Sequence, residues 1–130
     1  MNDPLVVVRR FLLAQAELQA LFGQRIYAAR NLPSGYEPKN GAALVINNRG
    51  GNQHFSSEVH TLSLQCRVYA ATESLAQDLC WKIYEVCNDR TSREIVYMRM
   101  EDGTMPQIIN EPVVGWPIGL IFFRVQVRKL

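Results

Sequence analysis

Residues 59–70, VHTLSLQCRVYA, carry the clearest structural signal in the chain. Apolar and polar side chains alternate along the whole segment, which predicts an extended strand with one buried face and one wet face. The buried face is expected to hold Leu62, Leu64, Cys66, Val68 and Ala70, and the wet face Thr61, Ser63, Gln65, Arg67 and Tyr69. The wet face is open either to solvent or to a partner.

A second alternating segment closes the chain at residues 119–128. One face is expected to carry Ile121, Phe123, Val125 and Val127, and the other Phe122, Arg124, Gln126 and Arg128. Shorter strands are predicted at residues 25–29, 42–47, 94–100 and 105–111. The Asp102-Gly103 pair is typical of a hairpin turn, so we expect the strand at 105–111 to return along the strand at 94–100.

Two amphipathic helices complete the pattern. Residues 3–22 combine an Asp3 cap with apolar residues at spacings of three and four, and Gly23 follows as a C-terminal cap. The second helix is expected to begin near Thr72, with Leu75, Leu79, Ile83 and Val86 on its apolar stripe. The order αβββαβββ predicts an α+β single domain over residues 1–130, with two helices on one face of a mixed, mostly antiparallel sheet. Leu18, Leu64, Leu79 and Phe123 are expected in one core cluster.

Length and composition fit one domain with a core of its own. The chain has 130 residues, of which 48% are hydrophobic and 20% charged, and its net charge is +2. This charge is too small to indicate a strongly basic nucleic-acid-binding protein. Arg9 and Arg10 interrupt the apolar residues near the N-terminus, so no signal peptide or membrane span is predicted. Three cysteines without paired spacing favour a reducing compartment.

The sequence holds no recognisable catalytic motif. His54, Glu58 and His60 could in principle bind a metal, but a closed site needs about four ligands, and polar surface residues are the better interpretation. Gly50-Gly51 lacks the lysine and hydroxyl of a phosphate loop. We therefore expect no enzymatic activity, no cofactor and no metal. A small enzyme or ligand-binding domain stays as the less favoured alternative.

Two features point to contacts with other proteins instead. Residues 48–58 are expected to form a polar loop, and its contact candidates are Arg49, Asn52, Gln53, His54 and Phe55, with Tyr36 and Lys39 in the loop at 30–41. The Phe55 side chain either tucks back onto its own domain or anchors an arm that reaches a neighbour. Arg67, Arg124 and Arg128 share the parity opposite the apolar positions, so they either form a solvated face or line a ring channel or subunit boundary.

Three segments resemble small phage tail-completion proteins of the tail terminator family. They are GQRIYAARNLPSGYEPKNGAALVINNRGG (23–51), the strand at 59–70 with the following Thr72 and Glu73, and EPVVGWPIGLIFFRVQV (111–127). The resemblance implies a structural virion protein that forms a ring, usually a hexamer, at the end of the tail tube nearest the head. Its partners would be copies of itself, the tail tube protein and a neck or connector protein, while DNA passes through the lumen without specific binding.

The same resemblance implies a place in the phage neck or tail and, during assembly, in the host cytoplasm, with no role for a membrane. Another neck component, an adaptor or a stopper, is the alternative within this class, because it would bind the portal side instead of the tube.

Overall fold

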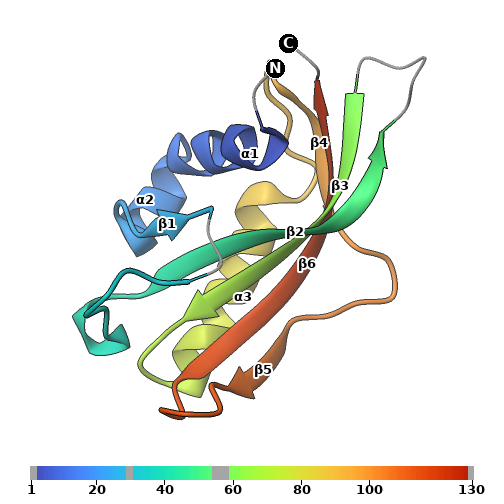
Figure 1. Cartoon of the computed structure of the whole chain (residues 1–130). Helices are drawn as coiled ribbons and strands as arrows, with labels where there is room; N and C mark the ends of the chain where they lie inside the picture. The colour runs from blue at the N-terminus through green and yellow to red at the C-terminus, as the bar shows by residue number, and fades with distance from the viewer. Residues whose placement is uncertain (1–2, 29–30, 54–58, 129–130) are drawn as a thin grey trace.

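The computed structural model describes residues 3–28, 31–53 and 59–128, which form one α+β domain as predicted. Figure 1 shows the α-helices on one side of a twisted six-stranded sheet. The helices are α1 (Pro4–Leu13), α2 (Ala16–Phe22) and α3 (Glu73–Cys87), with the short 3-10 helix η1 (Pro38–Asn40). The strands are β1 (Ile26–Tyr27), β2 (Ala43–Gln53), β3 (Val59–Tyr69), β4 (Ile95–Met100), β5 (Gln107–Asn110) and β6 (Pro117–Arg128).

The sheet is built around β3 and β6, the two strands with the strongest alternation. They pair antiparallel from Val59 opposite Arg128 to Tyr69 opposite Ile118. β2 pairs antiparallel with the other side of β3, and β1 pairs parallel with β2. The sheet is therefore mixed and mostly antiparallel, as predicted, and both alternating segments place their apolar residues on the helical side.

The core lies between this sheet and the helices. Leu18, Leu64, Leu79 and Phe123 belong to one contiguous cluster of buried side chains, which confirms the expected core. α3 begins where the sequence indicates, because the Thr72 hydroxyl accepts a hydrogen bond from the Leu75 amide (3.1 Å). The placement of the Leu75 side chain in the apolar stripe is wrong, since it is 41% exposed. The buried face of α3 is instead centred on the side of Ala76 and Cys80, where the helix approaches β6 most closely.

The single helix predicted over residues 3–22 is two helices. Gln15 has an extended backbone (ψ 114°), and its side-chain amide donates to the Phe11 carbonyl at the end of α1 (3.0 Å). Arg90, in the segment that follows α3, in turn donates from Nη1 to Gln15 Oε1 (2.8 Å). The break allows Leu12 in α1 and Leu18 in α2 both to be fully buried. Three α-helices in the described residues, rather than two, thus cover the sheet.

The polar segment expected as a loop over residues 48–58 is largely strand. β2 continues to Gln53, with a bulge between Asn48 and Gly51 in its pairing with β3. Gly50 allows the bulge because its φ is +122°, a value that L side chains rarely adopt, and its amide donates to Asn48 Oδ1 (2.9 Å). Residues 54–58 lie outside the described part of the chain.

The predicted hairpin between residues 94–100 and 105–111 is also wrong. β4 and β5 do not pair with each other; both run antiparallel to β6, β4 along residues 123–127 and β5 along residues 117–120. The outer edge of β4 is already used, because Asp89 N–H donates to the Met98 carbonyl (2.7 Å) and Met100 N–H donates to Asn88 Oδ1 (2.8 Å). A returning strand has no free edge there, so β5 pairs with the unused half of β6 (Figure 1).

Candidate functional site

The sheet face opposite the helices has an apolar half and a polar half. The apolar half is a small second cluster of buried side chains from β2, β3 and β6, namely Ala43, Val45, Tyr69, Ile118 and Leu120. The loop at residues 31–41 packs against this cluster through Leu32 and Tyr36. The chain therefore covers this half of the open face with its own loop.

An aromatic trio holds that loop in place. The rings of Tyr36, Tyr69 and Trp116 meet edge to face, with centroids 6.0 to 6.5 Å apart. The Tyr36 hydroxyl donates to the Gly41 carbonyl (2.7 Å), and burial of the ring raises the pKa of Tyr36 to about 12, against a smaller lowering by Arg25. The side chain of Tyr36, a predicted contact residue, thus packs and hydrogen-bonds within its own domain. Lys39 is exposed and lies 3.0 Å from the Glu37 carboxylate.

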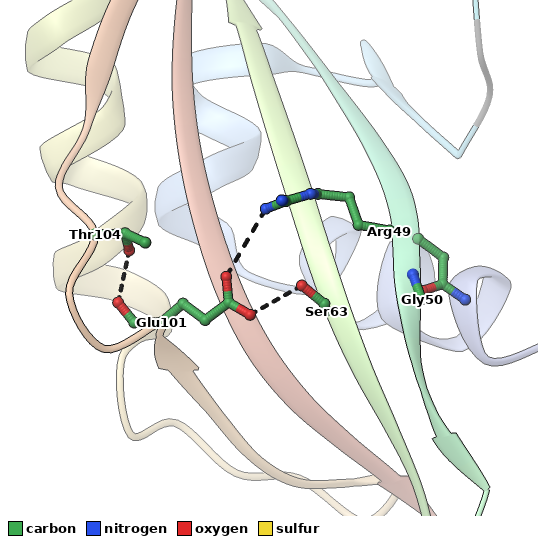
Figure 2. A network of polar contacts seen from close by, with 6 residues as sticks. Arg49, Gly50, Ser63, Glu101 and Thr104 are labelled. Atoms are coloured by element: carbon green, nitrogen blue, oxygen red, sulfur yellow. Dashed lines mark hydrogen bonds and ion pairs between the residues drawn. The ribbon is translucent and has the colours of Figure 1, made fainter.

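The polar half centres on Arg49, which the β2 bulge places over β6. Its guanidinium carbon lies 4.4 Å from the centroid of the Phe122 ring, within the range of a cation–π contact. Its Nη1 is 3.9 Å from Glu101 Oε2, while the other carboxylate oxygen accepts a hydrogen bond from the Ser63 hydroxyl (2.9 Å). Figure 2 shows this network, together with the hydrogen bond from the Thr104 hydroxyl to the Glu101 carbonyl (2.6 Å). Arg49 is therefore held on the open face.

The predicted arginines lie on the open face, as their parity requires. Arg67 is half-buried, and its Nη1 donates to the Tyr69 hydroxyl (3.2 Å). Arg124 is exposed on β6 opposite Ser63, and no ion pair joins it to a described residue. Arg128 is exposed at the end of β6, and its Nε donates to the Arg93 carbonyl (3.0 Å). The three are thus spread along the strands rather than gathered at one point.

Sequence reasoning missed a further arginine, Arg99 on β4. It is the register partner of Arg124 and bonds to the Asp89 carboxylate (2.7 Å). A register shift between Ile95 and Tyr97 explains the miss, since it puts two residues of equal parity on opposite faces. Around this pair the surface forms an open, polar hollow of about 370 Å³. Its lining is Tyr97, Arg99, Met100, Glu101, Asp102 and Arg124.

The other contact candidates lie at the far end of β2. Asn52 and Gln53 belong to the strand and pair with Thr61 and His60. His54 and Phe55 fall outside the described residues, so the arm hypothesis stays a prediction. The interpretation of His60 as a surface residue is wrong, because this side chain points to the helical side of β3 and is buried.

The described residues provide neither a metal-binding cluster nor an exposed thiol. In this part of the chain no group of three or more His, Cys, Asp or Glu residues is arranged to hold a metal ion. The three thiols are buried, and burial raises the pKa of each, to about 12 for Cys80 and Cys87. Such thiols are protonated near neutral pH and cannot act as exposed nucleophiles. No helix among the described residues has the length and apolar character needed to cross a membrane.

The comparisons with known proteins identify a structural neighbour. No protein-family model matches the chain, and no curated protein matches it. A chain in the structure titled "Virion of native gene transfer agent (GTA) particle" is similar with a TM-score of 0.67 and 16% sequence identity. The match covers 93% of this chain and 91% of that one. At this identity the two chains share a fold over nearly their full lengths.

Proposed function

We propose that this chain is a structural component of a phage-like virion, a ring-forming tail terminator that caps the tail tube and joins it to the neck. The observation that carries the proposal is the shared fold with a chain of a gene transfer agent virion, along 93% of the present chain. The resemblance of residues 23–51, 59–70 and 111–127 to tail terminators supports the same role. In this role the protein has no catalytic activity and acts through its surfaces.

The open face of the sheet would provide the charged surface of the ring. Arg67, Arg124 and Arg128 would face the lumen or a subunit boundary, and Arg99 would join them through its pairing with Arg124. DNA must slide through the lumen, so a few separated arginines suit this role better than a dense cluster, because each phosphate contact adds affinity. The ion pair of Arg99 with Asp89 lowers the net charge of the surface further.

The partners would be copies of this chain, the tail tube protein and a neck or connector protein. The β2–β3 end, with Asn52, Gln53, His54 and Phe55, would reach a neighbouring subunit or the tube. Arg49 and Tyr36 would mainly stabilise the open face of the sheet, since both side chains already have partners in their own domain. Lys39 is the exposed candidate in the loop that covers the apolar half.

The test is to measure the mass of the purified chain by light scattering at increasing concentration, and to locate it in particles by electron microscopy. We expect a closed oligomer, most simply a hexamer, at the head-proximal end of the tail tube. Binding to the portal side instead of the tube would favour the adaptor or stopper alternative. A strict monomer that is absent from particles would contradict the proposal.

The lumen assignment needs a separate test. Arg124→Glu should slow DNA passage or lower particle infectivity while the ring still forms. Arg10→Glu is the control, because it reverses an exposed arginine on α1, away from the open face of the sheet, where Arg10 pairs with Glu94. Equal effects of the two variants would contradict the placement of Arg124 in the lumen.

A further inference from the structure

The exposed apolar side chains of this domain are concentrated in one segment. Six large hydrophobic residues of the described chain are exposed, and four of them lie between residues 105 and 114. These four are Met105, Ile109, Val113 and Val114. Val113 is the most exposed, at 88%, and its neighbour Val114 is 56% exposed; both lie in the turn that joins β5 to β6. Turns that face only water commonly carry Gly, Asn, Asp or Ser, so two adjacent valines there indicate a contact surface.

Several hydrogen bonds fix the backbone of the turn that carries the valines. Glu111 Oε2 accepts hydrogen bonds from the amides of Val113 (3.0 Å) and Val114 (2.6 Å). The Glu111 amide donates to the Trp116 carbonyl, and the Gly115 amide donates to the Glu111 carbonyl, both at 2.8 Å. Trp116 is itself fixed by the aromatic trio. The two valines are thus held in place before any partner arrives, which lowers the entropy cost of binding.

The same domain has a hollow with two apolar lining residues on a different part of its surface. It lies between α2 and α3, has a volume of about 350 Å³ and is lined by Leu21 and Val86, with Glu17, Lys82 and Glu85 around them. These α3 residues lie in the C-terminal half of the helix. The valine turn lies at the other end, where the Ala70 amide donates to the Pro117 carbonyl just before α3 begins. Because α3 has 15 residues, it separates the two ends by about 20 Å.

We propose that the Val113–Val114 turn of one copy docks into the α2–α3 hollow of the next copy. A projecting patch and a hollow at different places on one chain make a heterologous contact, and such contacts build rings when the rotation closes. The inference rests on the proposed ring, and it assigns the anchor of the subunit interface. A second hollow, of about 240 Å³, lies beside Trp116 and Lys39, next to the turn of the same copy. Docking there would pair two copies symmetrically and would not extend to a ring.

The exposed apolar segment at residues 105–114 contributes four side chains, whereas a stable interface uses about 20–30 residues on each side. The valine turn is therefore the anchor of a larger contact and not the whole of it. Anchors in the centre of an interface dominate its energy, so polar replacement of both valines should weaken self-association at least about thirtyfold.

The first experiment compares Val113→Asn/Val114→Asn with Leu75→Asn, measured by light scattering and sedimentation. Leu75 is a matched control, because it is an exposed apolar residue on α3 outside the segment at 105–114. We expect the double variant to remain folded by circular dichroism and to lose the oligomer, and the control to keep it. An oligomer that forms unchanged in the double variant overturns this inference and leaves the proposed ring intact. A wild-type chain that is monomeric at every concentration and in particles contradicts both this inference and the proposed ring.

The second experiment tests the docking partner by oxidative crosslinking. The native thiols of the described structure are buried, so a cysteine pair at Val113 and Lys82 reports on the new contact alone. Val113→Cys/Lys82→Cys should give a ladder of covalent oligomers up to the full ring. Val113→Cys/Lys39→Cys should give none, and covalent dimers from that variant, without the ladder, would show symmetric docking and overturn the proposal. Covalent dimers of the single variant Val113→Cys would show that two turns contact each other, and this result would also overturn the proposal.

Discussion

Replacement of Gly119 by alanine tests a close contact between α3 and the sheet. Gly119 lies on β6, and a Cβ atom built there would be 2.5 Å from Cys80 Sγ and 3.1 Å from the Ala76 carbonyl oxygen on α3. The backbone of Gly119 does not have a positive φ, so the replacement adds volume without backbone strain. Real Cβ contacts are essentially never shorter than 3.0 Å, so the Cys80 side chain, α3 or the strand must shift. Overpacking of this kind costs about 1–3 kcal/mol of unfolding free energy.

The Cys80→Ala variant is the matched background for this test, because Cys80 Sγ is the atom that the added Cβ would approach most closely. In Cys80→Ala the sulfur is gone, and the tightest remaining contact of the added Cβ is with the Ala76 carbonyl oxygen (3.1 Å), which a shift of a few tenths of an ångström relieves. We therefore expect Gly119→Ala to cost much less in the Cys80→Ala background than in the wild type. The coupling between the two changes should be about 1 kcal/mol or more, in the range found for contacting residues.

Urea unfolding followed by tryptophan fluorescence and by circular dichroism measures all four proteins of the cycle. The slope of free energy against urea should stay the same, so that changes in midpoint report stability alone. Strict additivity of the two substitutions would refute the reasoning, as would a loss below about 0.5 kcal/mol for Gly119→Ala, the size of an ordinary surface substitution.

Four further outcomes follow from the contacts described above. Leu64→Ala should cost about 2–5 kcal/mol in urea unfolding, because the side chain is fully buried, and a loss near zero would contradict the core assignment. The thiols of the native chain should react with an aromatic disulfide reagent only at the rate of unfolding, whereas rapid modification would contradict their burial. Because the pKa of Tyr36 is raised from 10.0 to about 12, the unfolded chain releases this proton first, so stability should fall as pH rises from 10 towards 12, and Tyr36→Phe should lessen the fall. Glu101→Gln should cost less than about 1 kcal/mol and should mobilise Arg49 in NMR relaxation, since the pair is long and partly exposed.

The parts of the fold that the sequence predicts are those determined by side-chain parity. Residues 61–70 and 123–128 alternate between apolar and polar side chains, and the structure pairs β3 with β6 from Val59 to Tyr69 with the apolar sets on the helical side. Burial of one face of a strand specifies its register strongly, because a shift by one residue exposes every apolar side chain. The same parity places Arg67, Arg124 and Arg128 on the open face, although it does not indicate which groups they contact.

The errors arise where a distant segment decides the local structure. The break at Gln15 depends on Arg90, 75 residues away in the sequence, and the position of β5 depends on Asn88 and Asp89, which occupy the edge of β4. Gly50 illustrates a different difficulty, since a glycine in a polar segment suits a loop and a bulge equally well. No pattern within residues 48–53 distinguishes the two, because the pairing of β2 with β3 decides it.

The α-helices of the described residues cover only one face of this sheet. The other face has an apolar half and a polar half. The short contacts at Gly119 show that α3 packs closely against β6 at this point. On the open side, the loop with Tyr36 covers the apolar half, and the arginines with Glu101 occupy the polar half. Most of the large apolar side chains that are exposed among the described residues lie at residues 105–114, at the edge of the sheet. A charged partner would therefore meet the polar half of the face, whereas a protein partner would meet the edge, so the two contacts can be made at the same time. In a ring this requires the sheet faces to point towards the lumen while the valine turns point towards neighbouring subunits.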